Sequence, residues 1–261
     1  MGYNPVRFDS KEEIRDHLAQ VDPYDHNNAL VLHHTWKPTE KVWDDGYKWM
    51  KIEYDYFTYV KKPNWSHLPT QFWCAPDGIF DARPFSYRNG AHALIRKSVS
   101  GMSAELQAFI RECRNKGTKT SQALNHHSMG CETVGNFDGT DPRDNPAMEN
   151  SIILFAAAVE VWDIPLERIF FHREVEYKSC PGDLVTKDWF VNEVAREAST
   201  SPGQGPKDVV IVGSDGAEVV GANGKIQDDG RTYVVIAEVL DHEDMGFTWE
   251  GGSPNILRVK D

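Results

Sequence analysis

Residues 170–183 have the sequence FFHREVEYKSCPGD, which places an imidazole, an ammonium and a thiol in one short segment. His172 and Cys180 lie eight positions apart, and Lys178 precedes the cysteine by two. Histidine nitrogen and cysteine sulfur are ordinary zinc ligands. For an isolated pair, a buried core histidine and an inert thiol remain the alternative. The rest of the chain must therefore supply a third ligand.

The regions outside this stretch alternate between predicted strands and predicted helices. Compact apolar runs, one of them with a Pro-Asp-Gly turn, predict strands over residues 29–34, 71–83 (a hairpin), 129–134 and 169–171. Apolar residues at helical spacing predict helices over residues 9–20, 102–116, 147–162 and 186–198. Residues 41–66 are rich in Trp and Tyr without a clear period, so we expect loop and short pieces there. The alternation predicts an α/β domain over residues 1–198.

The composition changes after this domain. Residues 199–208, STSPGQGPKD, have the Ser, Pro and Gly content of a linker. Short β-rich runs separated by Gly, Asp and Asn follow, so we expect a small β-rich module over residues 209–261. A module of this size lies at the low end of independent stability.

Charge and cysteine content limit the classes of function. The formal net charge is −12 and the pI is about 5.3, which argues against a surface that binds nucleic acid. No apolar run approaches the ~18 residues needed to cross a bilayer. The first 20 residues lack the basic start and apolar core of a signal peptide, so we expect synthesis in the cytoplasm. Four cysteines without paired spacing are expected to be free thiols or, in one case, a ligand.

Two adjacent histidines, His33 and His34, close the apolar run that begins at Ala29. Strand alternation places His33 on the side of Val31 and His34 on the side of Leu32. The sequence does not show which of these sides faces a cleft.

Three motifs in this order carry a family resemblance: LVLHHTW (residues 30–36), SMGCETVG (residues 128–135) and FFHREVEYKSCPGD. They resemble the motifs of the zinc-dependent N-acetylmuramoyl-L-alanine amidases. This group includes type-2 amidases, phage lysozyme-type amidases and peptidoglycan recognition proteins. The resemblance covers about residues 29–190 and implies their α/β fold, with a mixed central β-sheet flanked by helices.

The resemblance implies that His33, His172 and Cys180 bind zinc. In this family the ligands are the first histidine after the strand, a later histidine, and a cysteine eight residues beyond it. Three protein ligands leave the fourth tetrahedral position of Zn²⁺ for water, which is the arrangement of a catalytic site. We expect His34 to support the fold or the ligands rather than to bind metal.

The family also implies a general base and a group that stabilises the oxyanion. Lys178 matches the lysine that phage-type members carry two residues before the cysteine. The tyrosine of those members is replaced here by Thr70, whose hydroxyl is far less acidic. Other members carry a glutamate in a Ser-Ile-Gly-Ile-Glu pattern, which corresponds to residues 128–132. We therefore expect Glu132 to be the general base and Lys178 to stabilise the oxyanion.

Two further residues are predicted to contact substrate or its attacking water. Thr70 keeps a hydroxyl at the position of the tyrosine. His92, in RNGAHA, resembles an element that lines the substrate groove in relatives. The alternative for Glu132 is a strand carboxylate that is satisfied by a hydrogen bond or salt bridge.

Together these residues predict a zinc hydrolase that cleaves the amide bond between N-acetylmuramic acid and L-alanine in bacterial peptidoglycan. The alternatives are a non-catalytic peptidoglycan-binding protein of the same fold, which commonly lacks the zinc cysteine, and a zinc peptidase acting on the stem peptide. Peptidoglycan is the expected partner, nucleic acid and membranes are not, and we expect a monomer. The missing signal peptide predicts action on the wall after release, as for bacteriolytic, antimicrobial phage endolysins.

The C-terminal module has a weaker resemblance of its own. Residues 224–250 faintly resemble the modules that are similar to the N-terminal part of copper amine oxidases. Such modules are attached to some bacterial surface and wall-lytic enzymes. The pattern is incomplete, so no copper is inferred. We expect this module to bind the cell wall.

Overall fold

The computed structural model describes residues 5–21, 28–43, 46–60, 67–83 and 90–199, together with six short strands after residue 209. The chain divides into two compact units, Met1–Ser199 and Thr200–Asp261. No helix in the described ranges is long and apolar enough to cross a membrane.

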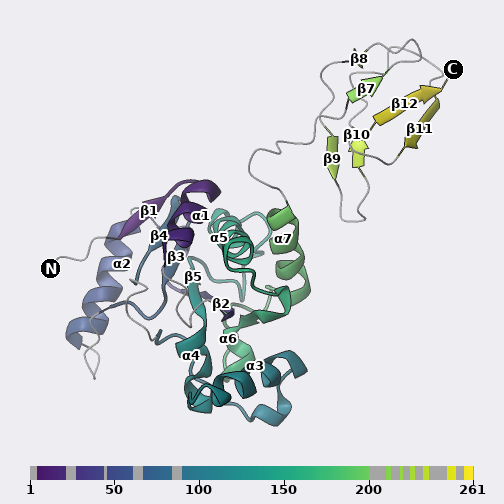
Figure 1. Ribbon diagram of the computed structural model, residues 1–261. Coiled ribbons are helices and arrows are strands. Elements are labelled where there is room, and N and C mark those ends of the chain that lie inside the picture. The colour runs from purple at the N-terminus through teal and green to yellow at the C-terminus, as the bar shows by residue number, and fades with distance from the viewer. Residues whose placement is uncertain are drawn as a thin grey trace. The chain divides into compact units, whose positions relative to one another are not determined.

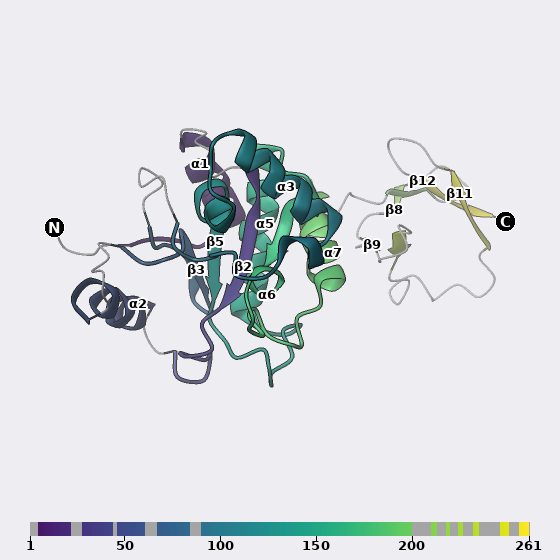
Figure 2. The same cartoon turned by 90° about the horizontal axis from the view of Figure 1, so that it is seen from below.

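A six-stranded sheet in the order β1-β4-β3-β5-β2-β6 forms the centre of the first unit. Its strands are β1 (Val6–Phe8), β2 (Leu30–His34), β3 (Phe72–Ala75), β4 (Gly78–Asp81), β5 (Met129–Thr133) and β6 (Ile169–Phe171). Strands β3, β5, β2 and β6 are parallel, whereas β1, β4 and β3 pair antiparallel. Figure 2 shows β3, β5 and β2 side by side. The predicted mixed sheet and the hairpin of β3 and β4 are confirmed.

Helices cover both faces of this sheet (Figure 1). They are α1 (Lys11–Gln20), α2 (Gly46–Asp55), α3 (Ala104–Asn115), α4 (Ala123–His127), α5 (Pro146–Trp162), α6 (His172–Val175) and α7 (Lys187–Ser199). On one face, α1, α5 and α7 bury apolar side chains against Leu30 and Leu32. On the other face, α3 and α4 pack against Val31 and Phe170. Because successive side chains of β2 point to opposite faces of the sheet, the strand contributes to a separate hydrophobic core on each face.

The prediction of loop and short pieces for residues 41–66 was wrong in part. Helix α2 begins at Gly46, and a single π-helical turn, Tyr56–Val60, continues it. Met50 and Phe57 are buried and pack in the cluster that contains Trp73. Exposed aromatic and aliphatic side chains, such as Tyr59, also lie on this segment. These exposed apolar side chains obscure the helical spacing of the buried ones. The helix is stabilised mainly by packing of its buried side chains against the sheet.

The register of the parallel strands decides where the polar side chains meet. His33 of β2 lies opposite Glu132 of β5, and Glu132 lies opposite Trp73 of β3. Residues paired in register point to the same face, so His33 and Glu132 lie side by side on the face of Val31. His172 follows β6 directly, at the carboxyl end that these strands share. The fold therefore gathers these three side chains at one edge of the sheet.

The described residues of the second unit form β-strands. They are β7 (Val210–Val212), β8 (Glu218–Val219), β9 (Gly224–Ile226), β10 (Thr232–Val234), β11 (Gly246–Glu250) and β12 (Ile256–Lys260). Their sheets have the orders β11-β12-β7-β8 and β10-β9. Except for Ser199, the predicted linker lies outside the described residues, and wall binding by this unit stays a prediction.

Candidate functional site

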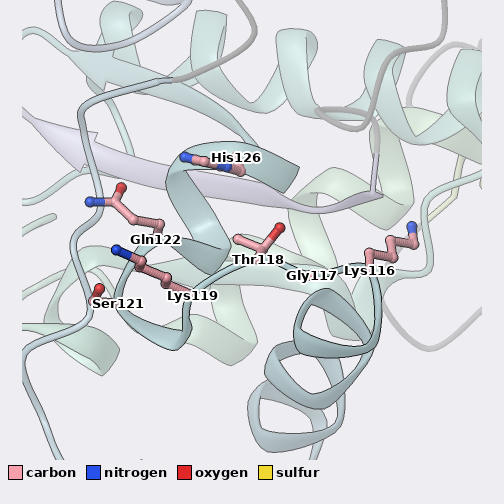
Figure 3. A pocket seen from close by; sticks show the side chains of 7 residues that line it. All are labelled: Lys116, Gly117, Thr118, Lys119, Ser121, Gln122 and His126. Atoms are coloured by element: carbon pink, nitrogen blue, oxygen red, sulfur yellow. The ribbon is translucent and has the colours of Figure 1, made fainter.

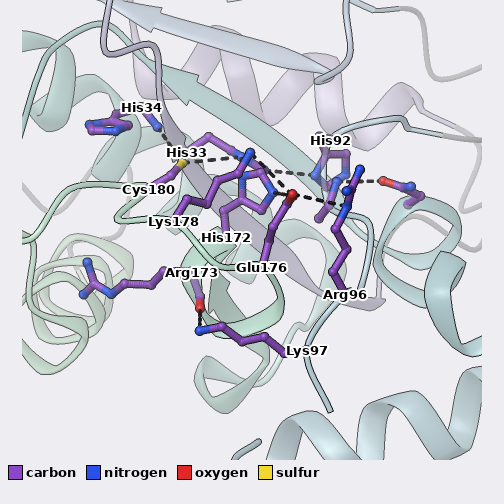
Figure 4. Close-up of polar contacts among 12 residues, drawn as sticks. His33, His34, His92, Arg96, Lys97, His172, Arg173, Glu176, Lys178 and Cys180 are labelled. Atoms are coloured by element: carbon purple, nitrogen blue, oxygen red, sulfur yellow. Dashed lines mark hydrogen bonds and ion pairs between the residues drawn. The ribbon is translucent and has the colours of Figure 1, made fainter. Parts of the chain in front are cut away.

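Two imidazole nitrogens and a sulfur converge at the carboxyl end of β2 (Figure 4). The potential ligand atoms of His33, His172 and Cys180 all lie within 4.8 Å of one another, and all three residues are buried. His33 Nδ1 is 2.9 Å from His172 Nδ1 and 3.8 Å from Cys180 Sγ. Within the described residues this is the one group of histidine, cysteine and acidic side chains that is arranged to hold a metal ion.

The loop that carries Cys180 is fastened to the start of α6. Arg173 donates a backbone hydrogen bond of 2.7 Å to the Cys180 carbonyl, and its guanidinium donates to the carbonyl oxygens of Gly182 and Val185. Gly182 has a φ of 116°, and a Cβ there would lie 2.5 Å from the Phe137 backbone. Only glycine fits this close approach. These contacts fix the sulfur at a set distance from His172.

His34 supports the site from the opposite side of β2. Its backbone N–H donates to Cys180 Sγ at 3.4 Å. Its Nδ1 accepts from the Phe137 backbone N–H at 3.3 Å, and its ring stacks on Phe137. His34 thus helps to hold the sulfur without presenting its ring to the other two ligand atoms.

Burial keeps both histidine rings neutral. It lowers the pKa of His33 well below its usual range, and the neighbouring His172 acts in the same direction. It also lowers the pKa of His172 to about 3, with Lys178 as the next cause. Burial raises the pKa of the Cys180 thiol. A cation would therefore meet two neutral imidazoles and would displace one thiol proton as it binds.

The donor set fits zinc. Tetrahedral Zn²⁺ has bonds of about 2.0–2.1 Å to nitrogen and about 2.3 Å to sulfur, so its donor atoms lie about 3.3–3.6 Å apart. The nitrogen–nitrogen separation of 2.9 Å is a few tenths of an ångström shorter than this, and the nitrogen–sulfur separation of 3.8 Å is slightly longer. Two imidazoles and one thiolate also match the ligand preference of zinc over magnesium or calcium.

A hollow of about 310 Å³ opens beside the three predicted ligands. Glu132 and Lys178 line it together with His33, His172 and Cys180. Burial raises the pKa of Glu132 well above its usual range, and the charge of Glu53 acts in the same direction, whereas Lys178 opposes it. The structure therefore brings together five of the seven predicted site residues.

The other two predicted residues, His92 and Thr70, do not line this hollow. His92 is buried, and its Nδ1 lies 3.0 Å from His33 Nε2. Its ring covers Gly130, where a Cβ would lie 2.7 Å from the ring atoms. Thr70 is fully buried, and its hydroxyl has no hydrogen-bond partner within the described part of the chain. For both, a contact with substrate stays a prediction.

Glu176 is a residue of this site that the sequence reasoning missed. Its carboxylate lies 3.1 Å from His172 Nε2 and 3.4 Å from Lys178 Nζ. The four-residue spacing from His172 is a signal that could have identified it, because residues four apart meet on one face of a helical turn.

A second hollow, of about 690 Å³, lies along the segment that joins α3 to α4 (Figure 3). Its lining is Lys116, Gly117, Thr118, Lys119, Ser121, Gln122 and His126. This wall holds neither a carboxylate nor a thiol, so it offers no general base of that kind and no soft metal ligand. The smaller hollow, which holds the possible metal ligands and a carboxylate, is therefore the candidate functional site.

A known family matches most of the first unit. The profile of the family described as N-acetylmuramoyl-L-alanine amidase matches residues 23–183, more than half of the chain. The N-acetylmuramoyl-L-alanine amidase CwlA of a Bacillus species is 29% identical over 99 residues. That alignment covers 37% of this chain and 39% of CwlA, so the match spans about two fifths of the relative.

Solved structures with similar folds have low sequence identity to this chain. Drosophila PGRP-LB is 20% identical, with a TM-score of 0.42, over 70% of this chain and 81% of that one. The endolysin N-acetylmuramoyl-L-alanine amidase LysCS from Clostridium intestinale is also 20% identical, with a TM-score of 0.42, over 66% of this chain and 86% of that one.

Proposed function

We propose that this chain, which belongs to the N-acetylmuramoyl-L-alanine amidase family, hydrolyses the bond between N-acetylmuramic acid and L-alanine in peptidoglycan with the help of one zinc ion. The match of the family profile to residues 23–183 confirms the amidase family predicted from the three motifs. The observation that carries the proposal is the convergence of His33, His172 and Cys180 beside a carboxylate and an ammonium.

The three converging residues would hold the metal. Zinc bound by them would lower the pKa of a coordinated water and polarise the carbonyl of the scissile amide. Neutral imidazoles and a deprotonated thiol are the forms that bind zinc, and burial keeps both histidines neutral.

Glu132 would move the proton. It lies in register with His33 on the same face of the sheet, at the wall of the hollow. Its carboxylate takes a proton from the attacking water as the oxygen bonds to the amide carbon. It then gives that proton to the nitrogen as the carbon–nitrogen bond breaks, which leaves a lactyl carboxylate on the sugar and a free amine on L-alanine.

Lys178 would stabilise the negative charge that develops on the amide oxygen. Its side chain is partly exposed, lines the hollow and makes an ion pair with Glu176 at 3.4 Å. An ammonium donates hydrogen bonds and carries a full positive charge, so it favours an oxyanion over a neutral carbonyl oxygen.

The nature of the new chemical ends tests this function. In purified peptidoglycan incubated with the zinc-loaded protein, we expect new free amino groups on the L-alanine of the stem peptide. The product is identified by labelling new amino groups before acid hydrolysis and by measuring new reducing sugars in parallel. A chelator should stop the reaction, and added zinc should restore it, because the site needs the ion.

Other outcomes would point to other functions. New amino groups on residues other than L-alanine would indicate a peptidase that acts on the stem peptide. New reducing sugars would indicate a glycosidase. Binding to the wall without any new ends would indicate a peptidoglycan-binding protein. Each of these results contradicts the proposal.

A further inference from the structure

The carboxylate of Glu176 contacts three functional groups at once (Figure 4). Its Oε2 lies 3.1 Å from His172 Nε2 and 3.4 Å from Lys178 Nζ. Its Oε1 lies 3.2 Å from Arg96 Nε. The side chain is only 19% exposed, so these contacts form in partly desolvated surroundings.

Local backbone structure brings Glu176 to this place. Helix α6 is a single turn that begins at His172, and the Glu176 N–H closes it by donating to the His172 carbonyl at 3.1 Å. The i,i+4 spacing sets the carboxylate beside the imidazole. The turn is anchored from outside, because Arg96 and Lys97 both donate backbone hydrogen bonds to the Val175 carbonyl. Glu176 is thus held on a fixed frame.

The contact with Glu176 decides which nitrogen of His172 carries the proton. A neutral imidazole has one N–H, and an ionised carboxylate only accepts hydrogen bonds. The proton therefore lies on Nε2, facing Glu176, and the lone pair lies on Nδ1. That nitrogen is the one directed at His33 Nδ1, 2.9 Å away. A carboxylate behind a metal-binding histidine fixes its tautomer and orientation in this way.

We propose that Glu176 is a positioning residue that presents His172 Nδ1 to the metal and holds the Lys178 ammonium at the wall of the hollow. One carboxylate oxygen serves both partners, and Arg96 fixes the other oxygen. This inference rests on the proposed function, since it assigns Glu176 a part in the same zinc site. Glu176 itself does not touch the reacting atoms.

Zinc affinity and tautomer test the proposal together. Glu176→Ala should weaken zinc binding about 10- to 100-fold, measured by competition with a chelator, because the imidazole loses its orienting partner. Glu176→Gln keeps an acceptor oxygen, so its loss should be about tenfold or less. At saturating zinc, both variants should lower kcat by about fivefold or less, with KM little changed, because only the Lys178 ion pair is missing. Glu167→Ala, an exposed acid nearby in sequence, is the matched control and should equal wild type.

A spectroscopic readout separates this inference from the function itself. In the metal-free protein, ¹⁵N shifts of His172 should show a protonated Nε2 in wild type and Glu176→Gln, and a mixture of tautomers in Glu176→Ala. Zinc affinity of Glu176→Ala within twofold of wild type, or an unchanged tautomer in Glu176→Ala, would overturn the positioning role. Failure of wild type to free the amino group of L-alanine would instead overturn the proposed function, and the tautomer comparison would still decide the role of Glu176.

Discussion

Replacing Cys180 with serine is expected to abolish peptidoglycan hydrolysis and to strip the protein of zinc. A hydroxyl is a far poorer zinc ligand than a thiolate, and only two histidines would remain. Zinc contributes several kcal/mol to the stabilisation of transition-state charge, so the rate of amide-bond cleavage should fall by roughly 10³-fold or more. Metal content by atomic absorption and product release at fixed enzyme concentration measure the two effects.

Cys113→Ser is the matched control for this substitution. Cys113 is also buried, but it lies in α3 and packs with Phe109 and Ile110 in a core cluster that does not contain Cys180. The variant should bind one zinc per chain and should keep its activity once folded. A Cys180→Ser protein with full zinc content and full activity would remove Cys180 from the site.

Replacing Glu132 with glutamine is expected to lower kcat by roughly 10²–10⁴-fold, the usual contribution of a general base. The amide has nearly the same shape but cannot take the proton of the attacking water. Zinc content should not change, because the carboxylate is not among the three converging ligands. Steady-state kinetics on a soluble muropeptide, together with the metal content, checks both expectations.

Thr70→Val is the informative comparison. It removes one neutral hydroxyl from a buried position outside the hollow, so kcat should fall by about tenfold at most. An inactive Thr70→Val enzyme beside a fully active Glu132→Gln enzyme would reverse this assignment and point to a water positioned by Thr70, which lies just before β3. Loss of zinc in Glu132→Gln would mean that the carboxylate helps to hold the ion.

The strand and helix pattern of the first unit was predictable because its apolar periods are strong. Leu30, Val31 and Leu32 form a buried run, and the three motifs around it indicated the family. Helix α2 was not predictable, because exposed aromatic residues lie on the same segment as the buried Met50. Its helical state depends on packing against Trp73, a residue distant in sequence, so the local pattern of residues 46–60 does not reveal it.

The sequence named five residues that lie together in the candidate site, but it did not give their geometry. Alternation paired His33 with Val31 but did not show which side of the strand holds the site. The answer depends on the register between β2 and β5, which places Glu132 beside His33. The role of Glu176 also depends on a fold-level fact, the single helical turn between β6 and the cysteine loop. His92 illustrates the same limit, because only the packing on Gly130 shows that its ring lies behind His33.

The proposed function requires one zinc ion bound by two imidazoles and one thiolate, those of His33, His172 and Cys180. X-ray absorption spectroscopy at the zinc edge of the purified protein reports these ligands. We expect one sulfur scatterer at about 2.3 Å, with two histidine nitrogens among the scatterers at about 2.0–2.1 Å. A zinc shell made only of nitrogen and oxygen, with no sulfur, would contradict it.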